Sequence, residues 1–294
     1  MKNKVLILYR VYPGISNSCK LNCNKIDLIR ECLKSFKNAF SNIDYDFFAL
    51  MDSCEEDIEM ELKKNIGVEN LTLCKRKNLG NFESFKYLID YSLNQKTNKI
   101  FFLEDDYFFS NSFDSNNFVK ALNHWDYITP YRSPENEEVN LSKRILSKKE
   151  DTGFQSTVFT TLTFATTVDV LRQDKKYFYL FERGIKDTLI WCLLTKPKNI
   201  YLYYFKVLFN FVRRILRLNH SEHKYRPGIR VMNQVFQLNF ILNLFNSPKR
   251  TLGTPIDGKC THLAGNFLEK NLLKEIEELG WIDNQYKYKN IFEK

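Results

Sequence analysis

The sequence predicts an α/β fold in which helices cover both faces of a mainly parallel sheet. Its first half alternates short apolar runs with longer segments of helical spacing, the pattern of repeated strand–helix–strand units. The chain has 294 residues, 44% of them hydrophobic and 15% aromatic, a composition that excludes disordered and fibrous proteins. A chain of this length buries roughly 75% of its unfolded surface without help from disulfides.

Short apolar runs predict the strands, and apolar residues three and four positions apart predict the helices between them. The predicted strands are Lys4–Val11, Tyr45–Met51, Leu71–Lys75, Lys99–Leu103 and Tyr127–Thr129. The predicted helices are Lys25–Phe40, Glu55–Asn65 and Phe82–Leu93. This order alternates strand and helix, so we expect the strands to run parallel.

The seven cysteines indicate a reducing compartment, because they are odd in number and follow no repeating spacing. Cys19 and Cys23 have the spacing of half a zinc site, but no second pair follows nearby, so buried free thiols are the preferred interpretation. The apolar run after Met1 is too short for a signal-peptide core, and no stretch approaches the ~18 apolar residues of a spanning helix. We therefore expect a cytoplasmic protein whose membrane contact, if any, is peripheral.

The positive charge is concentrated in one segment. The chain carries a formal charge of +9, while Lys196–Arg250 contains eleven basic residues and one acid, a net of +10. Apolar positions predict a basic amphipathic helix at 202–217 and a very apolar one at 231–245. Two interpretations stay open: docking on anionic lipid headgroups at the inner face of the cytoplasmic membrane, or two core helices with a solvated basic side. Nucleic acid is disfavoured because no binding motif is present.

Polar residues follow each predicted strand of the first half. Ligands of such sheets bind at the carboxyl ends of the strands. Two of these ends carry carboxylates and two carry cations, which suits a ligand with phosphate groups and a metal. The strand ends are Tyr9-Arg10, Asp52-Ser53, Lys75-Arg76-Lys77 and Glu104-Asp105-Asp106.

The acidic triplet Glu104-Asp105-Asp106 lies inside the apolar and aromatic run Phe101–Phe109. Burying such a cluster unpaired costs several kcal/mol for each ion. A divalent cation is the simplest compensation, because carboxylate oxygens suit Mg²⁺ or Mn²⁺ and a partly filled shell leaves room for diphosphate oxygens. The alternative is a solvated acidic turn at the end of a strand.

These residues resemble the GT-A-fold nucleotide-sugar glycosyltransferases, close to the bacterial family 2 enzymes of surface polysaccharide synthesis. Leu103–Asp106 resembles the Asp-x-Asp metal motif of that family but has Glu104 in the first place. The other matching segments are Val5–Arg10, Phe47–Asp52, Asn78–Phe85, a strand within Ser156–Ala165, Glu182–Trp191 and Cys260–Leu263. The resemblance spans residues 1–195 and resumes near Thr251, so the basic segment has no counterpart.

The resemblance implies roles for particular residues. Donor binding falls to Tyr9, Arg10, Asp52, Asn78, Asn81, Glu104 and Asp105. Asp106, Glu104 and His262 are expected to bind Mn²⁺ or Mg²⁺, although a lone histidine is often structural. Asp187 is the first choice for the general base, with Glu182 in reserve. Asp187 also precedes an apolar helix, where Asp is an ordinary residue.

The predicted function is metal-dependent transfer of a sugar from a nucleoside-diphosphate donor to a lipid-linked or surface glycan, with inversion favoured. Two alternatives stay open: a sugar-phosphate nucleotidyltransferase, although the repeated glycines of such enzymes are missing after Arg10, and a membrane-surface binding protein with a degenerate site. We expect a donor half at 1–130, an acceptor half at 131–195, the basic helices at 196–250 and a C-terminal segment with His262 and a terminal helix at 251–294.

Overall fold

The computed structural model describes residues 4–14, 24–131, 148–149, 153–156, 163–179, 248–256 and 259–262. The chain divides into two units, 1–184 with 251–294 and 185–250. The helices predicted at 202–217, 231–245 and the C-terminus lie outside the described residues. Within the described part, no helix is long and apolar enough to cross a membrane.

Nine strands of the described residues form one sheet in the order β3-β2-β1-β4-β9-β6-β10-β8-β7. Its first four members are β1 (Val5–Val11), β2 (Tyr45–Asp52), β3 (Leu71–Arg76) and β4 (Lys99–Glu104), and they run parallel. The predicted α/β fold is thereby confirmed. The chain winds outward from β1 to β3 and then returns to place β4 on the other side of β1, so the winding reverses between β1 and β4.

Beyond β4 the sheet becomes mixed. There β9 (Phe164–Thr167) runs antiparallel to both β4 and β6 (Tyr127–Ile128). The outer strands are β10 (Leu252–Pro255), β8 (Phe154–Ser156) and β7 (Lys148–Lys149). We predicted one strand within Ser156–Ala165, whereas β8 ends at Ser156 and β9 begins at Phe164, with 157–162 outside the described residues.

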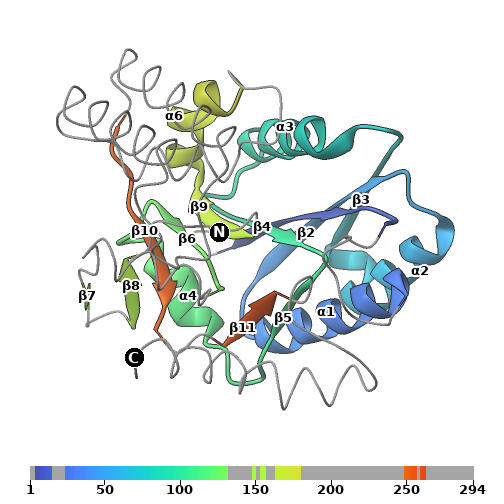
Figure 1. The fold of residues 1–294 in the computed structure, drawn as a ribbon, viewed down its shortest axis with the longest axis horizontal. Helices are drawn as coiled ribbons and strands as arrows, with labels where there is room; N and C mark the ends of the chain where they lie inside the picture. Colours follow the sequence, from blue (N-terminus) through green and yellow to red (C-terminus); the bar gives the residue numbers. More distant parts are fainter. Residues whose placement is uncertain are drawn as a thin grey trace, which may run out of the picture. The chain divides into compact units, whose positions relative to one another are not determined.

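Helices cover both faces of the sheet (Figure 1). One face carries α1 (Lys25–Ala39) and α2 (Glu56–Ile66), and the other carries α3 (Gly80–Leu93) and α6 (Val168–Tyr179). Alternation along the central strands explains both layers, because successive side chains point to opposite faces. Ile7 joins the core cluster with Phe36 of α1, whereas Phe48 stacks on Tyr91 of α3 with ring centroids 3.7 Å apart.

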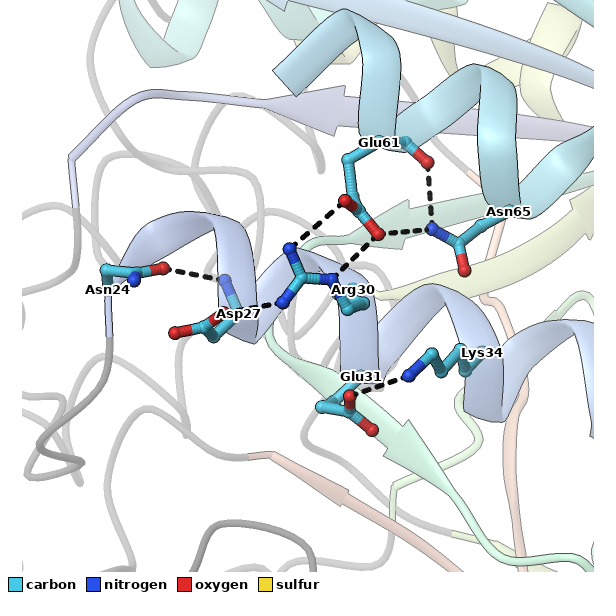
Figure 2. A network of polar contacts seen from close by, with 7 residues as sticks. All are labelled: Asn24, Asp27, Arg30, Glu31, Lys34, Glu61 and Asn65. Carbon is cyan, nitrogen blue, oxygen red and sulfur yellow. Dashed lines mark hydrogen bonds and ion pairs between the residues drawn. The ribbon is translucent and has the colours of Figure 1, made fainter. Parts of the chain in front are cut away.

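Charged side chains hold α1 against α2 (Figure 2). The Arg30 guanidinium donates to both carboxylate oxygens of Glu61, at 2.9 and 3.2 Å, and to Asp27 at 2.7 Å. Asn65 donates to the same Glu61 carboxylate at 2.9 Å. At the start of α1, the Asn24 side chain accepts from the Asp27 amide at 2.8 Å, so the first helical turn is capped.

A second, two-stranded sheet brings the late part of the chain back to its first half. It consists of β5 (Tyr107–Phe109) and β11 (Cys260–His262), which pair antiparallel. The Phe109 amide donates to the Ser35 hydroxyl of α1 at 3.1 Å, and the Phe109 and Phe36 rings lie 6.2 Å apart. Because β5 begins directly after the acidic triplet, this small sheet anchors the end of that triplet to α1.

Two further elements complete the described part. They are the 3₁₀ helix η1 (Val68–Asn70) and the helix α4 (Ser115–Ala121). Neither α4 nor α6 was predicted from the sequence. In α6 the buried positions Val168, Leu171 and Phe178 have helical spacing, which was the overlooked signal.

Candidate functional site

The reversal of winding between β1 and β4 marks the place where ligands of open α/β sheets bind. Arg10 of β1 and Glu104 of β4 are register partners there, and Arg10 Nη2 lies 3.3 Å from Glu104 Oε1. Arg10 Nη1 also donates to the Asn81 side chain and, at 3.5 Å, to its carbonyl oxygen. Three residues predicted to bind the donor therefore contact one another, from β1, β4 and the start of α3.

Asp52 ends β2 and holds the start of α3. One of its carboxylate oxygens accepts from the Leu79 amide at 3.1 Å, and the other accepts from the Gly80 amide at 2.8 Å. Ser53 and Asn78 both have left-handed backbones, with φ of 61° and 57°, and the Asn78 amide donates to the Ser53 hydroxyl at 2.9 Å. Such conformations cost about 1–3 kcal/mol each and concentrate at functional sites. The contacts seen for Asp52, which is 3% exposed, cap a helix, and its contact with a nucleoside stays a prediction.

The first two acids of the triplet each pair with a cation. Glu104 binds Arg10, as described above. Asp105 Oδ2 lies 2.7 Å from Lys25 Nζ and accepts from the Tyr12 amide at 3.4 Å. Burial raises the pKa of Asp105, the Lys25 ammonium opposes that rise, and the neighbouring Asp106 adds to it. Asp105 is thus a buried structural partner of Lys25, a residue that the sequence did not single out.

Asp106 lies next to the returning strand β11. In the β5–β11 ladder, His262 is the register partner of Tyr107, the residue directly after Asp106. The backbone of His262, which is distant in sequence, is thereby brought beside the acidic turn. Within the described residues, no three His, Cys, Asp or Glu side chains form a group able to hold a metal. The side chain of His262 lies outside that description.

Tyr9 belongs to the core. Its ring is 1% exposed and lies 5.4 Å from that of Phe47. Among the described residues its hydroxyl has no hydrogen-bond partner, and burial raises its pKa well above the ordinary value. We predicted a donor contact for Tyr9, but its surroundings are those of a packing residue.

The described cysteines are free thiols, and burial makes three of them unreactive. They are Cys32, Cys54, Cys74 and Cys260. Burial, followed by the charge of Asp105, raises the pKa of Cys54 to about 12, and burial raises the pKa of Cys32 and Cys260 further above the ordinary range. A thiol in this state is a poor nucleophile and a poor metal ligand. Cys19 and Cys23, the candidate zinc pair, lie outside the described residues.

The cations at the end of β3 have partners of their own. Lys75 forms an ion pair with Glu59 of α2. The Arg76 guanidinium lies 5.2 Å from the ring centroid of Tyr87 and donates to its hydroxyl at 3.4 Å. Since β3 is an edge strand separated from β4 by two others, Arg10 is better placed than these cations for a ligand at the reversal point.

The two candidate bases, Asp187 and Glu182, lie outside the described residues, so their roles stay predictions. Lys25 is a polar residue near the site that the sequence analysis missed. A local signal for Lys25 existed: it is the first residue of α1, where a cation opposes the helix dipole and therefore calls for an acidic partner.

No protein-family model matches the sequence, and no curated protein matches it. Solved structures with similar folds were found. The galactosyltransferase LgtC, in complex with donor and acceptor sugar analogues, is 9% identical, with 97% of this chain and 95% of that chain covered and a TM-score of 0.44. The 4-diphosphocytidyl-2C-methyl-D-erythritol synthase of Anaerococcus prevotii is 13% identical, with 64% and 82% covered and a TM-score of 0.40.

A proposed nucleotide-diphospho-sugar transferase of Desulfovibrio desulfuricans G20 is 12% identical and has a TM-score of 0.33. That match covers 44% of this chain and 58% of the other, so this chain spans less than two thirds of that protein. At identities near 10%, the function has to be argued from the residues of this chain.

Proposed function

We propose that the chain is a glycosyltransferase that moves a sugar from a nucleoside-diphosphate donor to a glycan or lipid-linked glycan. The carrying observation is the ladder that pairs His262 with Tyr107, directly after Asp106. An acidic strand end and a distant histidine become neighbours, as a metal-binding donor site requires. Arg10 and Glu104 at the adjacent strand ends, with Asn81 at the start of α3, support a polar ligand there.

The residues of this edge fit a divalent cation. Asp106 offers carboxylate oxygens and His262 an imidazole, and phosphate oxygens and water complete such shells. Asp106, Glu104 and His262 are the residues that would hold the ion, and Glu104 also pairs with Arg10. A bound cation would stabilise the negative charge of the departing nucleoside diphosphate.

Transfer also needs a group that accepts the proton of the acceptor hydroxyl. We assign this role to Asp187, with Glu182 in reserve, and we favour inversion at the sugar carbon. The proposal that the acceptor is linked to a lipid rests on the positive charge of one segment of the chain. Because Lys196–Arg250 carries a net of +10, we propose that this segment holds the enzyme at the anionic inner face of the cytoplasmic membrane, where lipid-linked glycans are made.

The test is a thermal-shift titration of the wild type with UDP and GDP, each with and without Mn²⁺. A ligand at 100 times its Kd stabilises a protein by about 2.7 kcal/mol, which is readily measured. We expect stabilisation that requires Mn²⁺ and that Asp106→Ala abolishes. Asp44→Ala, which removes a side chain that is 75% exposed, is the control.

Three results separate the alternatives. Equal stabilisation of the wild type and Asp106→Ala would remove Asp106 from the site. Stabilisation by nucleoside triphosphates only, with pyrophosphate released on addition of sugar phosphates, would favour a nucleotidyltransferase. No response to any nucleotide, combined with binding to anionic vesicles, would favour a membrane-surface binding protein.

A further inference from the structure

The buried ion pair between Lys25 and Asp105 joins three elements at the site. Asp105 follows β4, Lys25 begins α1, and the Tyr12 amide that shares Asp105 Oδ2 follows β1. The Lys25 and Asp105 side chains are only 11% and 13% exposed. An ion pair so far removed from water persists only where its geometry is good, and here Asp105 Oδ2 also accepts from the Tyr12 amide at 3.4 Å.

The position of Lys25 in its helix supports a specific role. Asn24 is the N-cap of α1, so Lys25 is the first helical residue. A cation at that end is disfavoured by the helix dipole, and burying a lysine also costs side-chain entropy. Only the contact with Asp105 offsets these costs among the described contacts of Lys25.

The rest of α1 is held in place independently of this pair. Arg30 ties the helix to Glu61 of α2, as Figure 2 shows, and Ser35 accepts from the Phe109 amide of β5. Lys25 therefore extends from a fixed helix. Its ammonium forms an ion pair with Asp105, the first residue of the Asp105-Asp106 turn. The Ser35 hydroxyl accepts a hydrogen bond from β5, the strand that follows this turn.

We propose that Lys25 is a positioning residue, which fixes the Asp105-Asp106 turn through Asp105 and so sets the place of the Asp106 carboxylate. This inference rests on the proposed function for its consequence, because Asp106 is the residue assigned to the metal–nucleotide complex. The ion pair that fixes the turn is present in the free protein and needs no ligand. Glu104 and Asp105 form ion pairs with Arg10 and Lys25, and Asp106 is the residue assigned to the ligand.

The test uses three variants of the full chain. Lys25→Met removes the charge and keeps the length of the side chain, Lys25→Arg keeps the charge, and Lys34→Met is the matched control. Lys34 also lies on α1 and also pairs with a carboxylate, Glu31 at 3.1 Å, but it is 51% exposed. If Lys25→Met does not fold, Asp105→Asn breaks the same pair from the other side.

The first measurement is hydrogen exchange of the free protein. In Lys25→Met we expect loss of protection at 105–109 with unchanged protection in β2, and in Lys25→Arg we expect protection to be restored. A residue with a merely global structural role would change exchange in both regions. Wild-type protection at 105–109 in Lys25→Met would overturn the inference, whether or not the protein binds nucleotides.

The second measurement is the affinity for UDP or GDP with Mn²⁺. Loss of a residue that orients a metal ligand typically weakens metal binding roughly 10–100-fold, which is the expected effect of Lys25→Met. Lys25→Arg and Lys34→Met should stay near the wild type. If the wild type binds no nucleoside diphosphate with Mn²⁺, the proposed function fails, while loss of protection in Lys25→Met still supports the hold on the turn.

Discussion

At the scale of single residues, one carboxylate has a structural role that the sequence did not indicate. The resemblance implies that Asp52 contacts the nucleoside, which stays a prediction, and in the structure both of its oxygens accept from amides at the start of α3. These amides have no partner within the helix, so a capping carboxylate is also favoured by the helix dipole. Asp52 thereby fixes the start of α3, where the next residue, Asn81, contacts Arg10 through its side chain.

We predict that Asp52→Ala lowers the free energy of unfolding by about 1–2 kcal/mol, the upper range for loss of a helix cap, because two amides lose their acceptor in a buried place. Urea unfolding measures this loss. Asn24→Ala, which removes a single hydrogen bond at the exposed start of α1, should cost about 0.5–1 kcal/mol. A smaller loss for Asp52→Ala than for Asn24→Ala would contradict the capping role.

At the scale of elements, the packing of α1 on α2 depends on the charged network around Glu61. Hydrogen bonds from Arg30 lower the pKa of Glu61, burial opposes this, and Asn65 adds to the lowering. A carboxyl whose pKa is lowered on folding contributes stability above its unfolded pKa, and this contribution is lost as the pH falls through the folded pKa. The network therefore stabilises the helix pair at neutral pH and less in acid.

We predict that Glu61→Gln costs about 1.5–3 kcal/mol at neutral pH, the range for hydrogen bonds to a charged group. The difference from the wild type should shrink below the ordinary Glu value of 4.5, since both proteins then carry a neutral side chain. Urea unfolding at about pH 7 and about pH 3 measures both effects. Lys34→Gln, at an exposed ion pair, should change stability by less than about 0.5 kcal/mol at either pH. A pH-independent cost of Glu61→Gln would refute the electrostatic explanation.

The elements that local patterns predict are those found in the first half. The strands β1 to β4 and the helices α1 to α3 follow from alternation and helical spacing. The start of α3 was misjudged by two residues, at Phe82 in place of Gly80, because the cap comes from Asp52 in a distant strand. Local spacing carries no trace of that contact.

The candidate site was predictable only in part, for a similar reason. Strand ends located Arg10 and Glu104, since parallel topology gathers those ends, and the family resemblance located Asn81. The ladder between β5 and β11 could not be derived, because strands of three residues have no measurable period and their pairing depends on the whole fold. The role of Lys25 could not be predicted either, because its partner Asp105 is distant in sequence and only the fold places the two side chains together.

At the scale of the whole molecule, charge is distributed unequally. Lys196–Arg250 has a net charge of +10, while the remaining chain has 33 basic and 34 acidic residues. A nearly neutral body pairs its charges internally, as Arg10, Lys25 and Arg30 do. The basic segment contains only one acid, so its positive charges have no matching negative charges within it. This favours an external anionic partner over a solvated face.

We predict that replacing Arg213, Arg214 and Arg217 by Gln weakens binding to vesicles of phosphatidylserine and phosphatidylcholine. At about 1 kcal/mol for each charge, the loss is on the order of 100-fold, and binding by the wild type should fall with added salt. Replacing Lys34, Lys63 and Lys64 by Gln removes the same charge from α1 and α2 and should leave binding nearly unchanged. Co-sedimentation with these vesicles and with pure phosphatidylcholine measures the partition. Equal binding by both triple variants would instead support the interpretation as core helices. Insolubility after deletion of 201–245 would support the same interpretation, because removal of buried apolar helices exposes the apolar surfaces that they cover.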